Sequence, residues 1–150
     1  MTLSAVLKIR PMELRDVPDV LSIQNASPGA ASWAKNDYEN VSASQFQVHV
    51  AADPNGVCGF VIARCAAREL EILNIAVAEA SRRKGIGSAL LEAVFEHSRA
   101  QSATTAFLEV RASNSAATEF YACHGFQITG RRRNYYQSPT EDALLLSRPL

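Results

Sequence analysis

The hydrophobic residues of this chain follow two periods, one typical of strands and one typical of helices. Alternating runs on either side of the turn sequence DPNG, FQVHVAA and VCGFVIARC, predict an antiparallel hairpin. Further strands are expected at 7–10, 69–77, 106–110, 126–133 and 142–147. This order of strands and intervening helices predicts an α+β architecture with a mixed, mostly antiparallel sheet.

Three segments carry helical signals. One begins at about Asp16, a residue type that caps helices, and accommodates Pro18 in its first turn. A second has an apolar face at helical spacing, formed by Ile86, Leu90, Leu91, Val94 and Phe95. The third, NSAATEFYACHG, ends at Gly125, because glycine is favoured just after the last helical turn. The stretch SPGAASWAKNDYENVS lacks a clear period and predicts a loop with short helical pieces.

Composition predicts one domain spanning residues 1–150. Of the 150 residues, 47% are hydrophobic and 20% are charged, which is enough apolar surface for one buried core. Fifteen basic and fifteen acidic residues cancel, so no overall field attracts nucleic acid or an anionic membrane. The opening MTLSAVLKIR lacks the apolar core of a signal peptide, and no run approaches membrane-spanning length, which favours a cytoplasmic protein. Three cysteines and three histidines lack metal-type spacing, so no metal site is expected.

The segment SRRKGIGS joins the end of a predicted strand to the start of a predicted helix. The first backbone N–H groups of a helix lack internal partners and carry partial positive charge, which favours anions. Gly85 and Gly87 allow an anion to approach the backbone, while Arg82, Arg83 and Lys84 add full positive charges. The segment therefore suits a pyrophosphate, although it lacks the Walker lysine motif and the glycine spacing of dinucleotide folds. On these residues alone, a solvated loop remains an alternative.

Two longer stretches narrow the interpretation. RRKGIG between LNIAV and SALLEAV resembles the acetyl-CoA pyrophosphate loop of the GNAT N-acetyltransferases. LEVRASNSAATEFYACHGF, followed by RRNYY and EDALLL, is similar to the RimI-type ribosomal-protein-alanine N-acetyltransferases. The resemblance implies a GNAT fold, with helices on both faces of the sheet, and acetyl-CoA as co-substrate. The chain departs from the family at Gln137, where proline is usual, and in the composition of the loop around SPGAASW.

The resemblance also implies an activity, which is acetyl transfer to a protein N-terminal amine. The implied partner is the N-terminal peptide of a ribosomal protein, beginning with alanine and belonging to the small subunit, with no direct nucleic acid and no membrane. A GNAT enzyme that acetylates a lysine side chain or a small amine remains an alternative, as does a non-catalytic acyl-CoA-binding regulator. The complete glycine loop and the candidate catalytic residues argue against the regulator.

The expected cofactor-binding residues follow from the same resemblance. The pyrophosphate loop comprises Arg82, Arg83, Lys84, Gly85, Ile86, Gly87 and Ser88. The backbone of Ile75, Ala76 and Val77 is expected to pair with the pantetheine arm like an added strand. Asn114 matches a cofactor-contacting asparagine of the family, and a helix N-cap is its alternative role.

Acetyl transfer to an amine needs a base for the amine and a proton for the leaving thiolate. By resemblance, Glu109 is the general base and Tyr121 the general acid. An ion pair with Arg111 is the alternative role for Glu109, and core packing is the alternative for Tyr121. Glu71 is the rival base, because it lies on the strand before the glycine loop.

The acceptor is expected to enter between the early loop and the C-terminal hairpin. Trp33 in the loop and Tyr135 and Tyr136 in the hairpin are the candidate substrate-binding residues. A hydrophobic plug is an equal alternative for Trp33. The run Arg131, Arg132 and Arg133 either faces a substrate or forms a solvated strand end.

Overall fold

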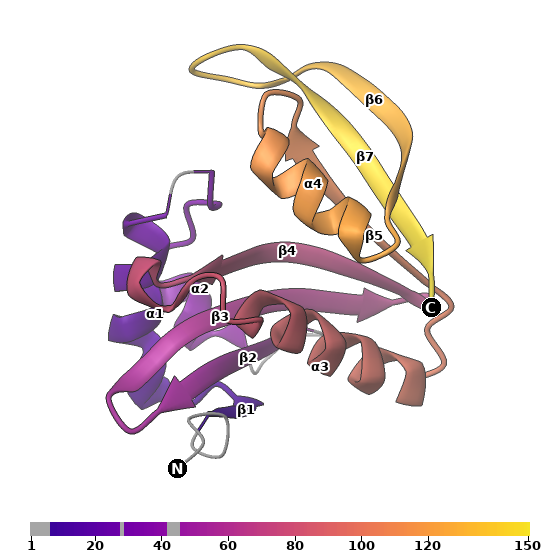
Figure 1. Cartoon of the computed structure of the whole chain (residues 1–150). Helices are drawn as coiled ribbons and strands as arrows, with labels where there is room; N and C mark the ends of the chain where they lie inside the picture. The colour runs from indigo at the N-terminus through magenta and orange to yellow at the C-terminus, as the bar shows by residue number, and fades with distance from the viewer. Residues whose placement is uncertain (1–6, 28, 42–45) are drawn as a thin grey trace.

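A seven-stranded sheet is the centre of the computed structural model, which describes residues 7–27, 29–41 and 46–150 (Figure 1). The strand order is β1-β2-β3-β4-β5-β7-β6. Every neighbouring pair is antiparallel except β4 and β5, which run parallel. The prediction of a mixed, mostly antiparallel sheet is confirmed.

The elements follow the hydrophobic pattern of the sequence. The strands are β1 (Lys8–Pro11), β2 (Phe46–Asp53), β3 (Gly56–Ala66), β4 (Glu69–Val77), β5 (Thr105–Arg111), β6 (Gln127–Tyr136) and β7 (Glu141–Pro149). The helices are α1 (Val17–Asn25), α2 (Lys35–Glu39), α3 (Ile86–Ala100) and α4 (Ser115–Cys123), with short 3-10 turns at η2 (Leu14–Asp16) and η4 (Glu79–Ser81). β6 extends beyond the predicted end of its strand, because Tyr136 still pairs with Glu141 of β7.

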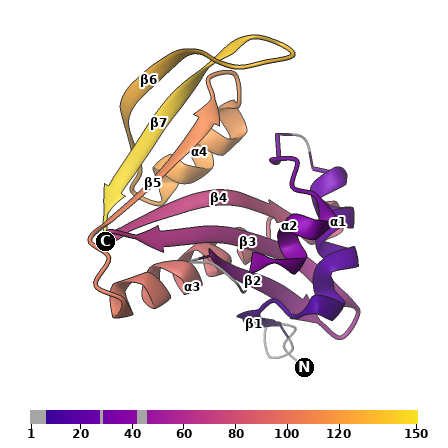
Figure 2. The same ribbon diagram turned by 180° about the vertical axis from the view of Figure 1, so that it is seen from behind.

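Helices cover both faces of the sheet, as Figure 1 and the reverse view in Figure 2 show. α3 and α4 pack on one face, and α1 and α2 pack on the other. The predicted apolar face of α3 is confirmed, since all of its members are buried: Ile86, Leu90, Leu91, Val94 and Phe95. Burying each of these large side chains contributes about 2 kcal/mol relative to leaving it in water. The two helix layers therefore hold the middle strands in a fixed position.

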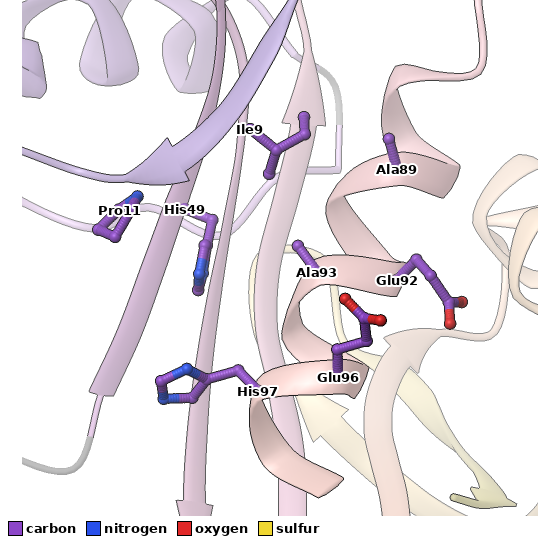
Figure 3. A pocket seen from close by; sticks show the side chains of 8 residues that line it. All are labelled: Ile9, Pro11, His49, Ala89, Glu92, Ala93, Glu96 and His97. Atoms are coloured by element: carbon purple, nitrogen blue, oxygen red, sulfur yellow. The ribbon is translucent and has the colours of Figure 1, made fainter. Parts of the chain in front are cut away.

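A shallow groove lies where α3 passes the edge of the sheet formed by β1 and β2 (Figure 3). Its volume is about 750 Å³. The residues that line it are Ile9, Pro11, His49, Ala89, Glu92, Ala93, Glu96 and His97. None of the predicted site residues is among them, so this groove is separate from the site described below.

A β-bulge interrupts β4 at Leu73. Ile62 of β3 pairs with Asn74 and its neighbour Ala63 pairs with Ile72, which leaves Leu73 without an opposite residue. Because side chains alternate along a strand, the extra residue reverses the faces beyond it. Ile72 therefore packs toward α3, whereas Ala76 packs toward α1.

β4 and β5 are joined only at one end. Residues 69–71 pair with residues 105–107, and beyond this point the two strands diverge, as Figure 1 shows. Each strand keeps its outer partner, because β4 pairs with β3 up to Val77 and β5 pairs with β7 up to Arg111. The inner edge of β4 beyond Glu71 is consequently left open in the described part of the chain.

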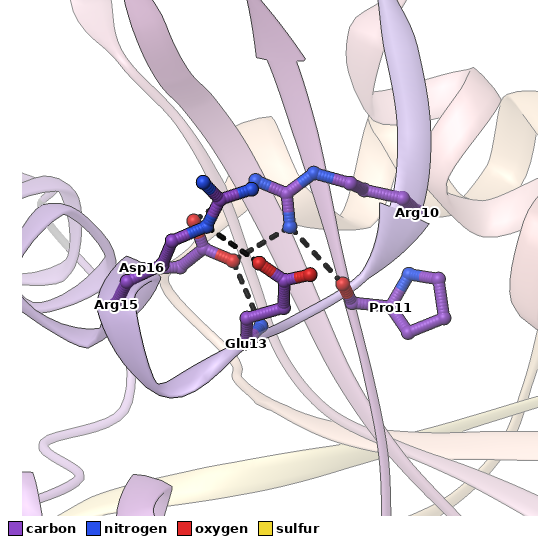
Figure 4. A network of polar contacts seen from close by, with 5 residues as sticks. All are labelled: Arg10, Pro11, Glu13, Arg15 and Asp16. Carbon is purple, nitrogen blue, oxygen red and sulfur yellow. Dashed lines mark hydrogen bonds and ion pairs between the residues drawn. The ribbon is translucent and has the colours of Figure 1, made fainter.

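An ion pair between the partly exposed Arg10 and the buried Asp16 fixes the entry to α1 (Figure 4). The Asp16 carboxylate accepts hydrogen bonds from Arg10 Nη1 at 2.7 Å, from Arg10 Nη2 at 2.9 Å and from the Glu13 backbone N–H at 2.8 Å. Asp16 occupies the N-cap position of α1, as predicted, but its side chain is committed to this network and makes no cap bond with α1. Pro18 does lie in the first turn. The Arg10 guanidinium, helped by the Glu13 N–H, lowers the pKa of Asp16 although burial opposes this.

Replacing Asp16 by asparagine is expected to lower the free energy of unfolding by about 2 kcal/mol at pH 7, since hydrogen bonds to a charge are lost. The pKa of Asp16 is lowered by folding. Its stabilisation is therefore fully present above the unfolded pKa of about 3.9 and disappears as pH falls through the folded value. Urea denaturation at several pH values should show a difference between wild type and Asp16→Asn that shrinks in acid. Asp19→Asn, on the exposed side of α1, is the control, and a pH-independent difference for Asp16→Asn would contradict the role of its charge.

Candidate active site

The N-terminus of α3 presents unpaired backbone donors. The first internal bond of the helix runs from Ala89 N–H to Gly85 O at 3.0 Å, so the N–H groups at 86–88 have no partner within the helix. No described side chain caps them. Gly85 has a φ of 78°, a left-handed conformation that disfavours other residues, and a Cβ built there would meet nothing within 4 Å. The donors at 86–88 therefore have no partner among the described residues, and the space beside Gly85 is open, as an anion site requires.

The three basic residues that were predicted for this site lie directly before these donors. Arg82 is tethered, because its Nε donates to the Val77 carbonyl at 3.0 Å, while Arg83 and Lys84 are exposed. Residues 82–88 thus supply three positive charges and three N–H groups that have no partner within the helix. This set of donors fits the pyrophosphate of acetyl-CoA.

The open edge of β4 offers backbone groups to an extended ligand. Ala78 N–H donates to the Cys58 carbonyl of β3 at 2.8 Å. Because N–H groups alternate between the two edges of a strand, those of Val77 and Ile75 are directed toward β5, where β4 has no partner strand in the described residues. Ala76 shares the orientation of Ala78 and presents its backbone to β3. Of the three residues predicted to pair with the pantetheine arm, Ile75 and Val77 have the required orientation.

Glu109 lies on the face of β5 away from α3 and α4. Its neighbours Leu108 and Val110 are buried in the core beneath α3, so alternation turns Glu109 to the opposite side. Arg132 Nε lies 3.2 Å from its Oε2, but this oxygen is buried and has no hydrogen bond with correct geometry among the described residues. The alternative prediction, an ion pair between Glu109 and Arg111, is wrong, because Arg111 pairs with Glu141 at 3.3 Å. A buried carboxylate oxygen without a donor is costly and leaves one position for a ligand or water.

Glu71 has a different environment. Its Oε1 accepts a hydrogen bond from Arg64 Nη2 at 2.6 Å. It also pairs in register with Phe107, at the end of the sheet where β4 and β5 are still joined. Glu71 therefore lies at the closed end of the divergence, and Glu109 lies beyond it.

Tyr121 lies on α4, on the other face of the sheet from Glu109. Its ring makes edge contacts with Phe120 at 5.2 Å and Phe126 at 5.4 Å between centroids, and only 6% of the residue is exposed. The core packing considered for this residue is confirmed. Burial raises the pKa of its phenol, so the hydroxyl stays protonated, and it has no hydrogen-bond partner in the described part of the chain. Tyr121 therefore has a ring that is fixed by packing and a hydroxyl proton that no described residue accepts.

Asn114 is the N-cap of α4, since its Oδ1 accepts a hydrogen bond from Ala117 N–H at 3.1 Å. The alternative role proposed for it is thus confirmed, and a contact with the cofactor stays a prediction. The amide nitrogen lies beside Gly29, because a Cβ built on Gly29 would come within 2.8 Å of Nδ2. The segment between α1 and α2 therefore reaches the start of α4.

The two tyrosines at the end of β6 stack with arginines. The Arg111 guanidinium carbon lies 4.4 Å from the centre of the Tyr136 ring, and that of Arg132 lies 5.5 Å from the Tyr135 ring. Burial, followed by the charge of Glu109, raises the pKa of Tyr136. The charge of Glu109 therefore acts on the Tyr136 phenol, whereas Tyr135 is 49% exposed. Both positions are consistent with the predicted acceptor side, which stays a prediction.

Trp33 packs into the core beneath α1 and α2. Its ring lies 5.4 Å from Tyr38 and 5.3 Å from Phe46 between centroids. These contacts confirm the plug considered for Trp33. Any contact with an acceptor would come from the part of its side chain that stays half-exposed.

The arginine run of β6 is not a uniform solvated end. All three arginines are exposed, but Arg131 pairs with Asp142 at 2.6 Å and Arg132 with Glu109 at 3.2 Å. Two of the three side chains therefore have carboxylate partners, one on the adjacent strand β7 and one on β5, which lies beyond β7.

Two polar contacts near the site were not predicted. Ser88 Oγ lies 3.0 Å from His124 Nε2, which connects the start of α3 to the end of α4. Asn74, which is only 6% exposed, bonds the segment between α1 and α2. A single asparagine inside the apolar run ELEILNIAV was a signal for the second contact, because a buried amide needs partners.

The described residues contain no group of three His, Cys, Asp or Glu side chains that could hold a metal ion. Within the same residues, no helix is both long enough and apolar enough to cross a membrane.

Comparison with known proteins identifies similar sequences and folds. The family model "Acetyltransferase (GNAT) domain" matches residues 44–128. The chain is 30% identical over 144 residues to the [ribosomal protein bS18]-alanine N-acetyltransferase of Escherichia coli K12, covering 95% of this chain and 97% of that protein. It is 32% identical over 143 residues to the putative enzyme of the same name in Bacillus subtilis, covering 92% of each. The crystal structure of Ard1 from Thermoplasma volcanium is similar with a TM-score of 0.85 and 32% identity, covering 97% of this chain and 98% of that one.

Replacing Gly85 by valine is expected to weaken acetyl-CoA binding at least tenfold. A β-branched residue is strained at a φ of 78°, by about 1–3 kcal/mol, and its side chain would fill the space before the free N–H groups. Isothermal titration calorimetry on the folded variant measures the change. Gly130→Ala is the matched control, because a Cβ there makes only ordinary contacts with Leu145. Equal affinity of Gly85→Val and wild type would reject this binding site.

Proposed function

This chain belongs to the GNAT family and is an acetyl-CoA-dependent N-acetyltransferase, and we propose that its acceptor is the N-terminal amine of a protein. One observation carries the proposal, namely the buried carboxylate oxygen of Glu109 beside the opening between β4 and β5. By analogy with the relatives' names, the acceptor is the N-terminal alanine of a small-subunit ribosomal protein. The partner is then a protein N-terminal peptide.

An α-amine suits a carboxylate base. Its pKa of about 7.7–8.0 leaves an appreciable neutral fraction at pH 7, whereas a lysine near 10.4 leaves roughly a thousandth. Glu109 then has to remove a proton from an amine that is already close to neutrality. It does so directly or through one water at its free oxygen, while Arg132 balances its charge.

The other reacting groups come from the opposite side of the opening. Acetyl-CoA supplies an activated acetyl group on a thiol that can leave. The N–H groups of Ile75 and Val77 point into the opening and can donate to a carbonyl oxygen on which negative charge develops. The Tyr121 hydroxyl, kept protonated by burial, supplies a proton to the departing sulfur. Base and acid thus lie on opposite faces of the sheet, and the reacting carbon lies between them.

Glu109→Gln and Tyr121→Phe are each expected to lower kcat by roughly 10²–10⁴-fold, the usual contribution of a proton-transfer group. Both substitutions preserve size, so acetyl-CoA affinity should change less than twofold, which calorimetry checks. Glu71→Gln is the matched control, since it removes an equivalent charge at the closed end of the divergence. If steady-state kinetics show a large fall in kcat for Glu71→Gln and an unchanged kcat for Glu109→Gln, Glu71 is the base instead.

The acceptor class is decided by mass spectrometry on three substrates. These are a peptide beginning with a free alanine, the same peptide with a blocked N-terminus and one lysine, and a polyamine. The free alanine peptide should have the highest kcat/KM, because its amine has the largest neutral fraction. Preference for the blocked peptide would establish a lysine acetyltransferase, and activity on the polyamine alone would establish a small-amine enzyme.

A further inference from the structure

An isolated asparagine on β4 holds a loop beside the site. Asn74 Oδ1 accepts a hydrogen bond from Ala31 N–H at 3.1 Å, and its Nδ2 donates to Ala31 O at 3.2 Å. One side-chain amide therefore bonds both backbone groups of one residue, as a neighbouring strand would. Asn74 faces α1 only because the bulge at Leu73 reverses the alternation of β4.

Two more buried side chains extend this network. Asn74 Nδ2 also donates to Gln24 Oε1 at 3.3 Å, and Gln24 Nε2 donates to Trp33 O at 2.8 Å. The Tyr38 hydroxyl donates to the same Gln24 oxygen. Burying such polar groups is unfavourable unless each has a partner, and here each has one. The segment 29–33 is consequently bonded at two points, Ala31 and Trp33.

This segment lies on the face of the sheet that we assign to the acceptor. From its bonds with β4, it runs to the N-terminus of α4, where Gly29 abuts Asn114. It lies with α1 and α2 on the face of the sheet that carries Glu109. The pyrophosphate loop packs with α3 on the other face, and no contact connects it to Asn74 in the described residues.

We propose that Asn74 is a positioning residue for acceptor recognition, because it fixes segment 29–33 as a wall on the face of the sheet that carries Glu109. The proposal rests on the proposed function only for the existence of an acceptor on this face, whatever amine it carries. Loss of the Asn74 bonds leaves Ala31 without its link to β4, while Trp33 stays bonded to Gln24. The acceptor then has to order this wall when it binds, which raises the KM for the acceptor.

The test uses Asn74→Leu, which keeps the size of the side chain but cannot bond Ala31. The KM for the best acceptor of the wild-type enzyme should rise about tenfold, corresponding to the loss of two net hydrogen bonds. The KM for acetyl-CoA should stay within twofold. Since the acceptor is chosen by wild-type activity, the test stands even if an N-terminal peptide proves to be the wrong class.

A second variant covers the case in which Asn74→Leu does not fold. Ala31→Pro removes the N–H that Asn74 accepts and alters an exposed residue. It should reproduce the rise in acceptor KM. Asn40→Leu is the matched control, because its amide bonds only Asn36 within α2, and it should behave as wild type.

A purely structural role for Asn74 predicts a different result. In that case the melting temperature falls and both KM values change together. Either this parallel change or an unaltered acceptor KM in folded Asn74→Leu and Ala31→Pro would overturn the proposal.

Discussion

The divergence of β4 and β5 beyond Glu71 is the constraint on which the other features of the site depend. A parallel pair would ordinarily continue its hydrogen bonds to the end of the shorter strand. Here β3 holds β4 and β7 holds β5, so the two halves of the sheet keep their own ladders while the inner edges separate. Buried backbone groups without partners are unfavourable. The open edge is therefore a position where an extended ligand gains hydrogen bonds that the protein does not make itself.

The opening also separates two electrostatic tasks. The helix N-terminus and the basic residues before it favour an anion on the α3 side, whereas Glu109 favours an amine on the opposite side. Neither task needs a large net charge, which agrees with a formal charge of +0 for the chain. Local fields act over a few ångströms, and screening by salt limits longer-range attraction. Recognition can consequently rest on short contacts in and beside the opening.

Structural features that depend on residues close together in the sequence could be predicted from the sequence. The positions of the strands along the chain, the buried face of α3 and the glycine loop follow from local period and from the chemistry of helix ends. Resemblance supplied Glu109 and Tyr121, and the structure places them on opposite faces of the sheet, while their roles stay predictions. Features created by pairing between distant segments could not be predicted. These include the bulge at Leu73, the pairing of Glu109 with Arg132 rather than Arg111, and the ion pair between Arg10 and Asp16.

Amide hydrogen exchange on β4, with and without acetyl-CoA, tests the central claim most directly. In the protein alone, the N–H groups of Asn74 and Ala76 are directed to β3, whereas those of Ile75 and Val77 face the opening. Adding acetyl-CoA is predicted to slow exchange at Ile75 and Val77, together with the first turn of α3, and to leave Asn74 and Ala76 nearly unchanged. Unaltered exchange at Ile75 and Val77 under saturating acetyl-CoA would contradict the assignment of the open edge as the binding site.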